Sequence, residues 1–535
     1  MSDERVLAPP SGPPEGVAPD VVDASTMSER QKTIAFLIMA LGMFIALLDI
    51  QIVASSLAEI QAGLAATPDE VAEVQTWYLV AEVIMIPLSG WLSRILSTRW
   101  LFTASAAGFT LASAGCAFAW NIESMIAFRT LQGFLGGAMV PTAFATGFAI
   151  FPGEKQGRVA PILGIVATCA PALGPTIGGY ITEILDWRWL FFINFAPGLF
   201  IVLTIPRLLR IDRPNPYLLK HFDVPGAVFL ASCLGCLQYV LDEGPRKGWF
   251  EDHSMLTLFV ISIASGALFI WRSLTYREPI VDLRAFRVRN FSLGCVLSLV
   301  TGVGLYGMVY LTALFFVSIR GWDSMQVGRT VFVFGLSQLF ATPIAGILSR
   351  KLDPRYVLTF GFSLYAFSTW MLCSVTARSG FDEVLLSQIL RGIASMTCIV
   401  TVTNVALGSM GPVQLKSASG LFNLMRNLGG AIGLAVLNTQ LFYNRFELHY
   451  DRLVSAIDPS RLDSAAAFGL AERLADQGLD ADVSVRQATT LLAKLVAREA
   501  LVQSFADAFL LVAACFLVGL LLVPWLRSIR ATVRG

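Results

Sequence analysis

Hydrophobic residues in this chain gather into long runs that are separated by short segments rich in arginine and glycine. A membrane-spanning helix needs about 20 predominantly apolar residues. Fourteen such runs can be identified, at residues 33–56, 71–92, 100–120, 124–150, 158–182, 188–208, 224–242, 254–274, 291–317, 326–348, 356–377, 384–408, 416–442 and 504–527. The pattern predicts an all-α membrane protein with fourteen transmembrane helices and with both chain ends on one side.

The composition and the absence of known motifs argue against several classes of function. Of the 535 residues, 55% are hydrophobic and 14% are charged, whereas soluble domains carry about 25% charged residues. The net charge of +1 gives no general attraction for nucleic acid. The eight cysteines lie in apolar runs without metal-ligand spacing, and no Walker, His-Glu-x-x-His or Gly-x-Ser-x-Gly motif occurs. We therefore expect no cofactor, no metal and no enzymatic activity, and any work would be driven by an ion gradient.

The basic residues predict the orientation of the chain. Loops on the side of both chain ends hold seventeen Lys and Arg, against five in the short loops of the other side. Because cytoplasmic loops carry this excess, both termini are predicted to be cytoplasmic. Residues 1–31, rich in Pro and Gly, predict a disordered tail. The long connection 443–503 predicts a partly helical element on the outer side.

The two halves of the chain repeat each other. GWLSRILSTRWLF from Gly90 is matched by GILSRKLDPRYVL from Gly346, and FRTLQG around Arg129 by SQILRG around Arg391. Parallel repeats of this kind are typical of transporters. The sequence predicts a six-helix bundle at 32–210, two inserted transmembrane helices at 211–278 and a second six-helix bundle at 279–535. The candidate conformational residues of the repeated loops are Gly90, Arg94, Arg99, Gly346 and Arg350.

Charged residues inside a membrane helix are costly and mark functional sites. The first half has Asp49, Glu82 and Arg129 in predicted helices. Burial favours the neutral form of an acid, and a nearby arginine favours the carboxylate. A motion that moves the arginine relative to the acid would therefore load and release a proton, so these three residues are predicted to couple transport to protons. The alternative is a static ion pair that fixes the register of the helices. Polar residues on the same helix faces are predicted to line a cavity: Gln75, Tyr78 and Gln132.

The second half has arginines instead, and its helices offer one carboxylate, Asp507, near the outer start of the last helix. We therefore expect the first half to carry the proton and the second half to line the cavity. The positive charge of Arg391 would favour neutral or anionic amphiphiles. The lining residues predicted in this half are Arg391, Asn423, Arg426 and Asn427.

The segment Gly164–Tyr180, GIVATCAPALGPTIGGY, holds more Gly and Pro than a helix interior usually tolerates. At 100° per residue most of them fall on one side of a helix, and a glycine face lets a neighbouring helix approach closely. We expect this face to meet a helix of the second half in a tight, bendable seam. The seam residues are Gly164, Pro171, Gly174, Pro175, Gly178 and Gly179.

Several of these strings together resemble the major facilitator superfamily, in particular the 14-helix drug:proton antiporters of the EmrB/QacA branch. LLDIQIV around Asp49 is similar to the family's first-helix motif, and APALGPTIGG to its helix-five antiporter motif. FRTLQGFLGG resembles the fourth-helix motif, whose arginine is implicated in proton transfer, and LDEGPRKGWF resembles the EmrB group.

This resemblance implies the major facilitator fold and proton-coupled efflux of hydrophobic or amphipathic drugs and toxic compounds across a bacterial inner membrane. It also implies a periplasmic membrane-fusion adaptor and an outer-membrane channel as partners. One loop departs from the family, because its acidic position is Arg94 and its second glycine is Ser97. The acid-centred charge network proposed to lock the outward-facing state cannot form there in its usual version.

Two other functions are compatible with the sequence. One is the dedicated export of a single metabolite, such as a fatty acid or a siderophore. The other is a membrane sensor or scaffold that transports nothing. The sensor needs no buried carboxylates, so Asp49 and Glu82 argue against it.

Overall fold

The computed structural model describes residues 27–527 apart from 152, 277, 412–413 and 457–480, and every regular element in this part of the chain is a helix. Most of the predicted tail lies outside the described residues. Helix α1 begins earlier than predicted, at Glu29, because Ser28 and Gln31 form a capping box. The Gln31 main-chain N–H donates to the Ser28 hydroxyl at 3.2 Å, and the Ser28 main-chain N–H donates to the Gln31 side chain at 3.0 Å.

The first half of the chain forms one helical bundle. Its elements are α1 (Glu29–Ser55), α2 (Leu57–Leu64), α3 (Pro68–Leu96), α4 (Thr98–Ala117), α5 (Ile122–Gly136), α6 (Met139–Ile150), α7 (Val159–Ile184), α8 (Trp189–Phe192) and α9 (Phe195–Leu208). Helices α5 and α6 together make one span, as α8 and α9 do. Within this bundle α3 packs on α5, and α1 packs on α7.

An inserted helix pair and a second bundle follow. The pair is α10 (Val224–Glu243) and α11 (His253–Thr275), preceded by the short 3₁₀ helix η2 (Pro216–His221). The second bundle contains α12 (Arg289–Arg320), α13 (Ser324–Lys351), α14 (Pro354–Trp370), α15 (Phe381–Leu407), α16 (Leu415–Thr439), α17 (Arg445–Ala456) and α19 (Ala481–Leu522). Here α12 packs on α16 and α13 on α15, which repeats the pairing of distant helices seen in the first bundle.

The prediction of fourteen transmembrane helices is confirmed. The described residues contain 13 helices that are long and apolar enough to cross a membrane, and a further pair, Lys155–Pro171 and Leu173–Ile184, that is bent by 41°. This pair includes α7, so the bend lies in the Gly/Pro segment. A proline inside a helix removes a backbone donor and bends the helix at that place.

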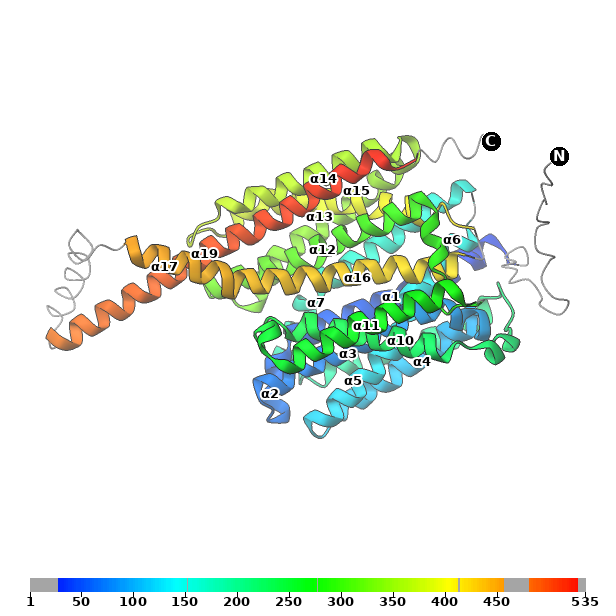
Figure 1. Cartoon of the computed structure of the whole chain (residues 1–535), viewed down its shortest axis with the longest axis horizontal. Coiled ribbons are helices and arrows are strands. Elements are labelled where there is room, and N and C mark those ends of the chain that lie inside the picture. Colours follow the sequence, from blue (N-terminus) through cyan, green and yellow to red (C-terminus); the bar gives the residue numbers. More distant parts are fainter. Residues whose placement is uncertain (1–26, 152, 277, 412–413, 457–480, 528–535) are drawn as a thin grey trace, which may run out of the picture.

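The two bundles lie side by side, and the inserted pair lies along one flank (Figure 1). Contacts between the bundles are made by α7 with α13 and α15, and by α16 with α3 and α6. Helix α10 packs against both α3 and α16. Helix α1 begins and α19 ends at the same end of the molecule, called the proximal end below, and the opposite end is called distal (Figure 1).

Two helices extend the second bundle at the distal end. Helix α17 and the first part of α19 project beyond the other helices (Figure 1). Both belong to the connection 443–503, so its described parts are helical. Residues 457–480 lie outside the described part of the chain.

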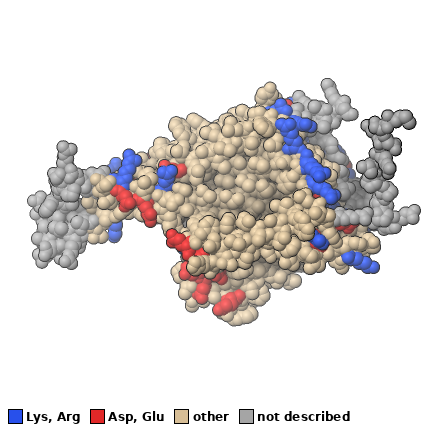
Figure 2. All heavy atoms as spheres, in the orientation of Figure 1, with Lys and Arg blue, Asp and Glu red and all other residues tan. Residues whose placement is uncertain are grey.

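The charged side chains lie toward the two ends of the long axis. On the face shown in Figure 2, a broad band carries no Lys, Arg, Asp or Glu. Lys and Arg group near the proximal end, whereas the distal end carries Asp and Glu together with some Lys and Arg on the projection. A band without charge is the surface that a lipid bilayer requires.

Candidate functional site

An ion pair lies at the centre of the first bundle. Asp49 of α1 and Arg129 of α5 approach to 2.5 Å between Oδ2 and Nη1, and neither side chain is exposed. Gln132 of α5 lies beside them, where its amide donates to Asp49 Oδ1 at 3.1 Å and its carbonyl oxygen accepts from Arg129 Nη1 at 2.9 Å. The structure thus brings together Asp49 and Arg129, predicted as proton-coupling residues, and Gln132, predicted as a lining residue.

Residues of α3 complete the surroundings of Arg129. Gln75 accepts from its Nη2 at 3.4 Å, and the Tyr78 ring centroid lies 4.1 Å from its guanidinium carbon, a cation–π distance. The Arg129 Nε and the Tyr78 hydroxyl have no hydrogen-bond partner among the described atoms. The guanidinium of Arg129 is therefore held through hydrogen bonds of Nη1 and Nη2, and not through Nε.

Asn194 is a member of this site that the sequence analysis missed. It lies between α8 and α9, is buried, and donates from Nδ2 to Asp49 Oδ1 at 2.7 Å and to Ser113 Oγ at 3.0 Å. Its signal in the sequence is a lone amide in the apolar string WRWLFFINFAPG. An amide in such a run needs buried partners, but the sequence alone does not show that the partner is Asp49.

Glu82 of α3 is the second buried carboxyl of the first half, with 4% of its surface exposed. It forms no hydrogen bond or ion pair with any described residue. The positive charges of Arg129 and of Arg426, from the second half, both act on it electrostatically. An ionised carboxylate without partners is costly inside a membrane protein. The neutral and the ionised forms of Glu82 therefore differ strongly in free energy at this position.

Two arginines of the second half, Arg391 and Arg426, are buried without carboxylate partners among the described residues. Arg426 of α16 donates from Nη2 to Asn423 Oδ1 at 2.6 Å, but its Nε and Nη1 have no partner among the described atoms. Arg391 of α15 donates to Gln388 and, at 3.4 Å, to Thr312. Its guanidinium carbon lies 4.9 Å from the ring centroid of Phe334. The two halves therefore differ in charge at their centres.

Asp507 does not join these arginines. It lies in α19, where its carboxylate is 2.9 Å from His449 Nε2 and 3.5 Å from Arg445 Nε, both of α17. This cluster ties α17 to α19. The prediction that the first half holds the proton-carrying acids is consistent with this placement.

The prediction for the Gly/Pro face of α7 is wrong for its distal part. A Cβ added at Gly178 would lie 3.0 Å from the Ile52 carbonyl oxygen, and one added at Gly174 would meet the Gln51 main chain at 3.1 Å. Both contacts are with α1 of the same bundle. Of the three glycines of this face whose contacts are described, Gly164 meets the second half, where it faces Met396 of α15 at 3.2 Å.

The reason for the difference is that the neighbours of α7 change along its length. Helix α7 packs against α1, α13 and α15, and it is bent in its Gly/Pro segment. One helix face can therefore point to another bundle at one end and to its own bundle at the other. Of the other seam residues, Pro171 is buried, whereas Pro175 and Gly179 border a distal cavity.

This distal cavity has a volume of about 490 Å³. It lies among α2, α7 and the start of α13, and it carries three carboxylates. Its lining residues are Glu59, Pro175, Thr176, Gly179, Tyr180, Thr182, Glu183 and Asp323. None of the seven predicted lining residues borders it: Gln75, Tyr78, Gln132, Arg391, Asn423, Arg426 and Asn427. In this conformation they lie within the packed interior or at its edge.

The repeated loops lie at the proximal end, where they touch the other half. A Cβ added at Gly90 would lie 2.8 Å from the Lys416 carbonyl oxygen, and one added at Gly346 would lie 2.8 Å from Pro161 Cγ. Arg350 reaches Gly157 of the first half. The two bundles are therefore in close contact at this end.

The other two loop arginines lie on the first half. The guanidinium carbon of Arg99 is 5.1 Å from the ring centroid of Trp100. Arg94 lies in the last turn of α3, where its carbonyl oxygen accepts from the Asn215 main-chain N–H at 3.3 Å.

Two helical bundles that repeat each other, with a buried ion pair inside one of them, are the architecture of a membrane transporter. The chain belongs to the major facilitator superfamily, whose sequence profile matches residues 39–434. It is a multi-pass membrane protein, and the predicted major facilitator fold is confirmed.

Relatives with described functions are similar over most of the chain. The colistin resistance protein EmrB of Acinetobacter baumannii is 41% identical over 76% of this chain and 79% of its own length. The multidrug export protein EmrB of Haemophilus influenzae is 30% identical over 91% and 94%. The fatty acid resistance protein FarB of Neisseria gonorrhoeae is 28% identical over 92% and 95%.

Solved structures share the fold at low identity. The crystal structure of the human organic anion transporter MFSD10 superposes with a TM-score of 0.57 at 15% identity, over 92% of this chain and 99% of the other.

Proposed function

We propose that this protein exports hydrophobic or amphipathic drugs and toxic compounds in exchange for protons. The observation that carries the proposal is the pair of buried carboxyls in the first bundle, one held by an arginine and one without a partner among the described residues. The EmrB names of the similar proteins support the substrate class. The likeness to FarB keeps export of a fatty acid as the second candidate.

Glu82 is suited to load and release a proton because its surroundings belong to both bundles. As a neutral acid it needs no ionic partner in its buried position. As a carboxylate it is attracted by Arg129 of its own bundle and by Arg426 of the other. A rocking motion that changes the distance between Glu82 and Arg426 would change the stability of the carboxylate. One proton would then be taken up and released in each cycle.

Asp49 and Arg129 have a second role in this mechanism. The ionised pair holds α1 against α5 and fixes the orientation of the guanidinium, which also acts on Glu82. A proton arriving at Asp49 would weaken the pair and free Arg129 to interact more strongly with Glu82. The two acids would thereby be coupled through one arginine.

The proposed orientation puts the proximal end in the cytoplasm of a bacterium. The excess of Lys and Arg at this end supports it. Both termini would then be cytoplasmic, and the acidic distal cavity would open to the periplasm. The distal projection of α17 and α19 would be available to a membrane-fusion adaptor that leads to an outer-membrane channel.

Transport in inverted membrane vesicles tests this proposal. The expected result is uptake of an amphipathic dye such as ethidium when a proton gradient is applied, with loss of uptake when a protonophore removes the gradient. Laurate competition in the same assay tests the fatty acid candidate. For variants that neutralise a buried carboxyl, such as Glu82→Gln, the matched control is Glu123→Gln. It neutralises an exposed carboxylate at the start of α5. Gradient-independent dye distribution would contradict the proposal.

A further inference from the structure

A second charge cluster lies at the proximal end of the molecule, between the two bundles. Its centre is Asp212, in the connection between α9 and η2. This connection lies on the first bundle, because the main-chain N–H of Asn215 donates to the Ile95 carbonyl oxygen of α3 at 3.0 Å and the Ile211 side chain is buried. Asp212 is therefore a fixed part of the first half.

Asp212 caps the start of α4. The Thr98 main-chain N–H donates to its two carboxylate oxygens at 2.9 and 3.1 Å, and the Thr98 hydroxyl donates to Oδ2 at 2.6 Å. The first N–H groups of a helix lack partners within the helix, and a negative charge is favourable there. The carboxylate is thus held in one orientation by groups of its own half.

The same carboxylate pairs with a residue of the other half. Lys416 is the second residue of α16, and its Nζ lies 2.8 Å from Asp212 Oδ2. The two side chains are only 7% and 3% exposed. A lysine in the first turn of a helix lies at the positive end of the helix dipole, so its burial there needs a nearby anion. Asp212 is the carboxylate with which it pairs.

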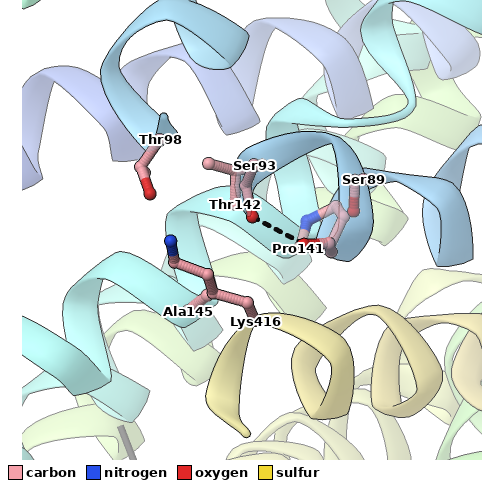
Figure 3. A pocket seen from close by; sticks show the side chains of 8 residues that line it. Ser89, Ser93, Thr98, Pro141, Thr142, Ala145 and Lys416 are labelled. Atoms are coloured by element: carbon pink, nitrogen blue, oxygen red, sulfur yellow. Dashed lines mark hydrogen bonds between the residues drawn. The ribbon is translucent and has the colours of Figure 1, made fainter. Parts of the chain in front are cut away.

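The close contact of the bundles encloses this pair. The Lys416 carbonyl oxygen lies against Gly90 of α3, where a side chain would not fit. The Lys416 side chain extends toward Thr98, and Ser93 and Thr142 of the first half lie close by (Figure 3). They border a cavity of about 10 Å³ together with Lys416, which is about the space of one water molecule. Bulk water is therefore kept from the ion pair while the bundles touch.

We propose that Asp212 and Lys416 form a latch that stabilises the conformation with a closed proximal end. Asp212 supplies this carboxylate from the connection between α9 and η2, outside the repeated loop that carries Arg94. The inference rests on the proposed function, since it assumes that the proximal end opens to the cytoplasm during transport. When it opens, both charges enter water and the pair is lost.

Distance measurements between spin labels test the latch without measuring transport. Labels attached to p-acetylphenylalanine at positions 158 and 352 report the proximal end, and labels at 185 and 378 report the distal end, while the eight native cysteines remain. Lys416→Met removes the cation and leaves the cap of α4 intact. Asp212→Asn removes the anion. Each variant is expected to raise the ratio of proximally open to closed molecules about tenfold or more.

A double variant and a control complete the experiment. Combining both substitutions should shift the ratio no further than one alone, because residues of one pair do not act additively. The control is Glu29→Gln, which breaks an exposed 2.6 Å ion pair with Lys155 inside the first half and should leave the ratio unchanged. Unchanged distances in Lys416→Met, or an equal shift in Glu29→Gln, would overturn the latch.

The distance measurements and the vesicle uptake assay together distinguish a failure of this inference from a failure of the proposed function. If the distances shift as expected while wild-type vesicles show no proton-driven uptake, the latch is supported and antiport fails. If wild-type vesicles transport and Lys416→Met leaves the distances unchanged, antiport is supported and the latch fails.

Discussion

Asp49 and Arg129 form an ion pair 2.5 Å long with no exposure of either side chain, although 80 positions separate them in the sequence. Gln132 and Asn194 both donate to the same carboxylate oxygen of Asp49. The pair thus joins α1 and α5, and the segment between α8 and α9 is attached to it. Changes at any of these positions should affect both stability and proton coupling.

Removal of one charge from this pair should be strongly destabilising. Asp49→Asn leaves the Arg129 guanidinium buried without a counter-ion, which is expected to cost about 3–5 kcal/mol. Thermal unfolding in detergent should show a lower melting temperature than the wild-type protein, and proton-driven uptake in vesicles should be lost. Combining Asp49→Asn with Arg129→Gln should recover part of the stability without recovering transport. Recovery of transport in the double variant would instead support a static ion pair.

Glu82→Gln should separate coupling from folding. Glu82 makes no hydrogen bond or ion pair with described residues, so the substitution removes no partner. Its melting temperature should stay close to that of the control Glu123→Gln. Substrate-induced proton release from the purified protein, followed with a pH dye in weak buffer, should be abolished. Normal release would show that Glu82 does not carry the proton.

Asn194→Ala tests the member of the site that the sequence analysis missed. The variant removes the 2.7 Å hydrogen bond to Asp49 and the 3.0 Å hydrogen bond to Ser113. Loss of a buried hydrogen bond to a charged group should cost about 1.5–3 kcal/mol, measured as a lower melting temperature and slower uptake. Thr204→Val is the control, since Thr204 bonds only the carbonyl oxygens of its own helix. Equal effects of the two variants would contradict a special role for Asn194.

Gly174→Leu should block transport while the chain still inserts into the membrane. A side chain at this position would strike the main chain of α1 at Gln51, so α1 and α7 could not keep their close approach. Gly164→Ala is a milder variant for comparison. Its Cβ would meet the flexible end of the Met396 side chain at 3.2 Å, so this substitution should be tolerated. Membrane content by immunoblot and uptake per molecule measure the two effects. Normal uptake by Gly174→Leu would exclude a need for close α1–α7 packing.

The sequence by itself determined the helical architecture. The length of each apolar run sets whether it can cross a bilayer, and the cost of burying charge makes Asp49, Glu82 and Arg129 conspicuous in such runs. These are local properties, so they can be recognised without knowing which helices are neighbours. The fourteen spans could be predicted for this reason, whereas the family was indicated by the resemblance of motif strings such as APALGPTIGG.

The tertiary structure decided which groups meet. Asn194 reaches Asp49 across 145 positions, and Asp212 reaches Lys416 across 204. The Gly/Pro face of α7 meets α1 over its distal part, where the sequence predicted the second half. Helix neighbours depend on tilt, crossing and bending, which arise from packing over the whole bundle. A periodic pattern shows which side of a helix carries small or polar residues, but only the assembled bundle determines which helix packs against that side.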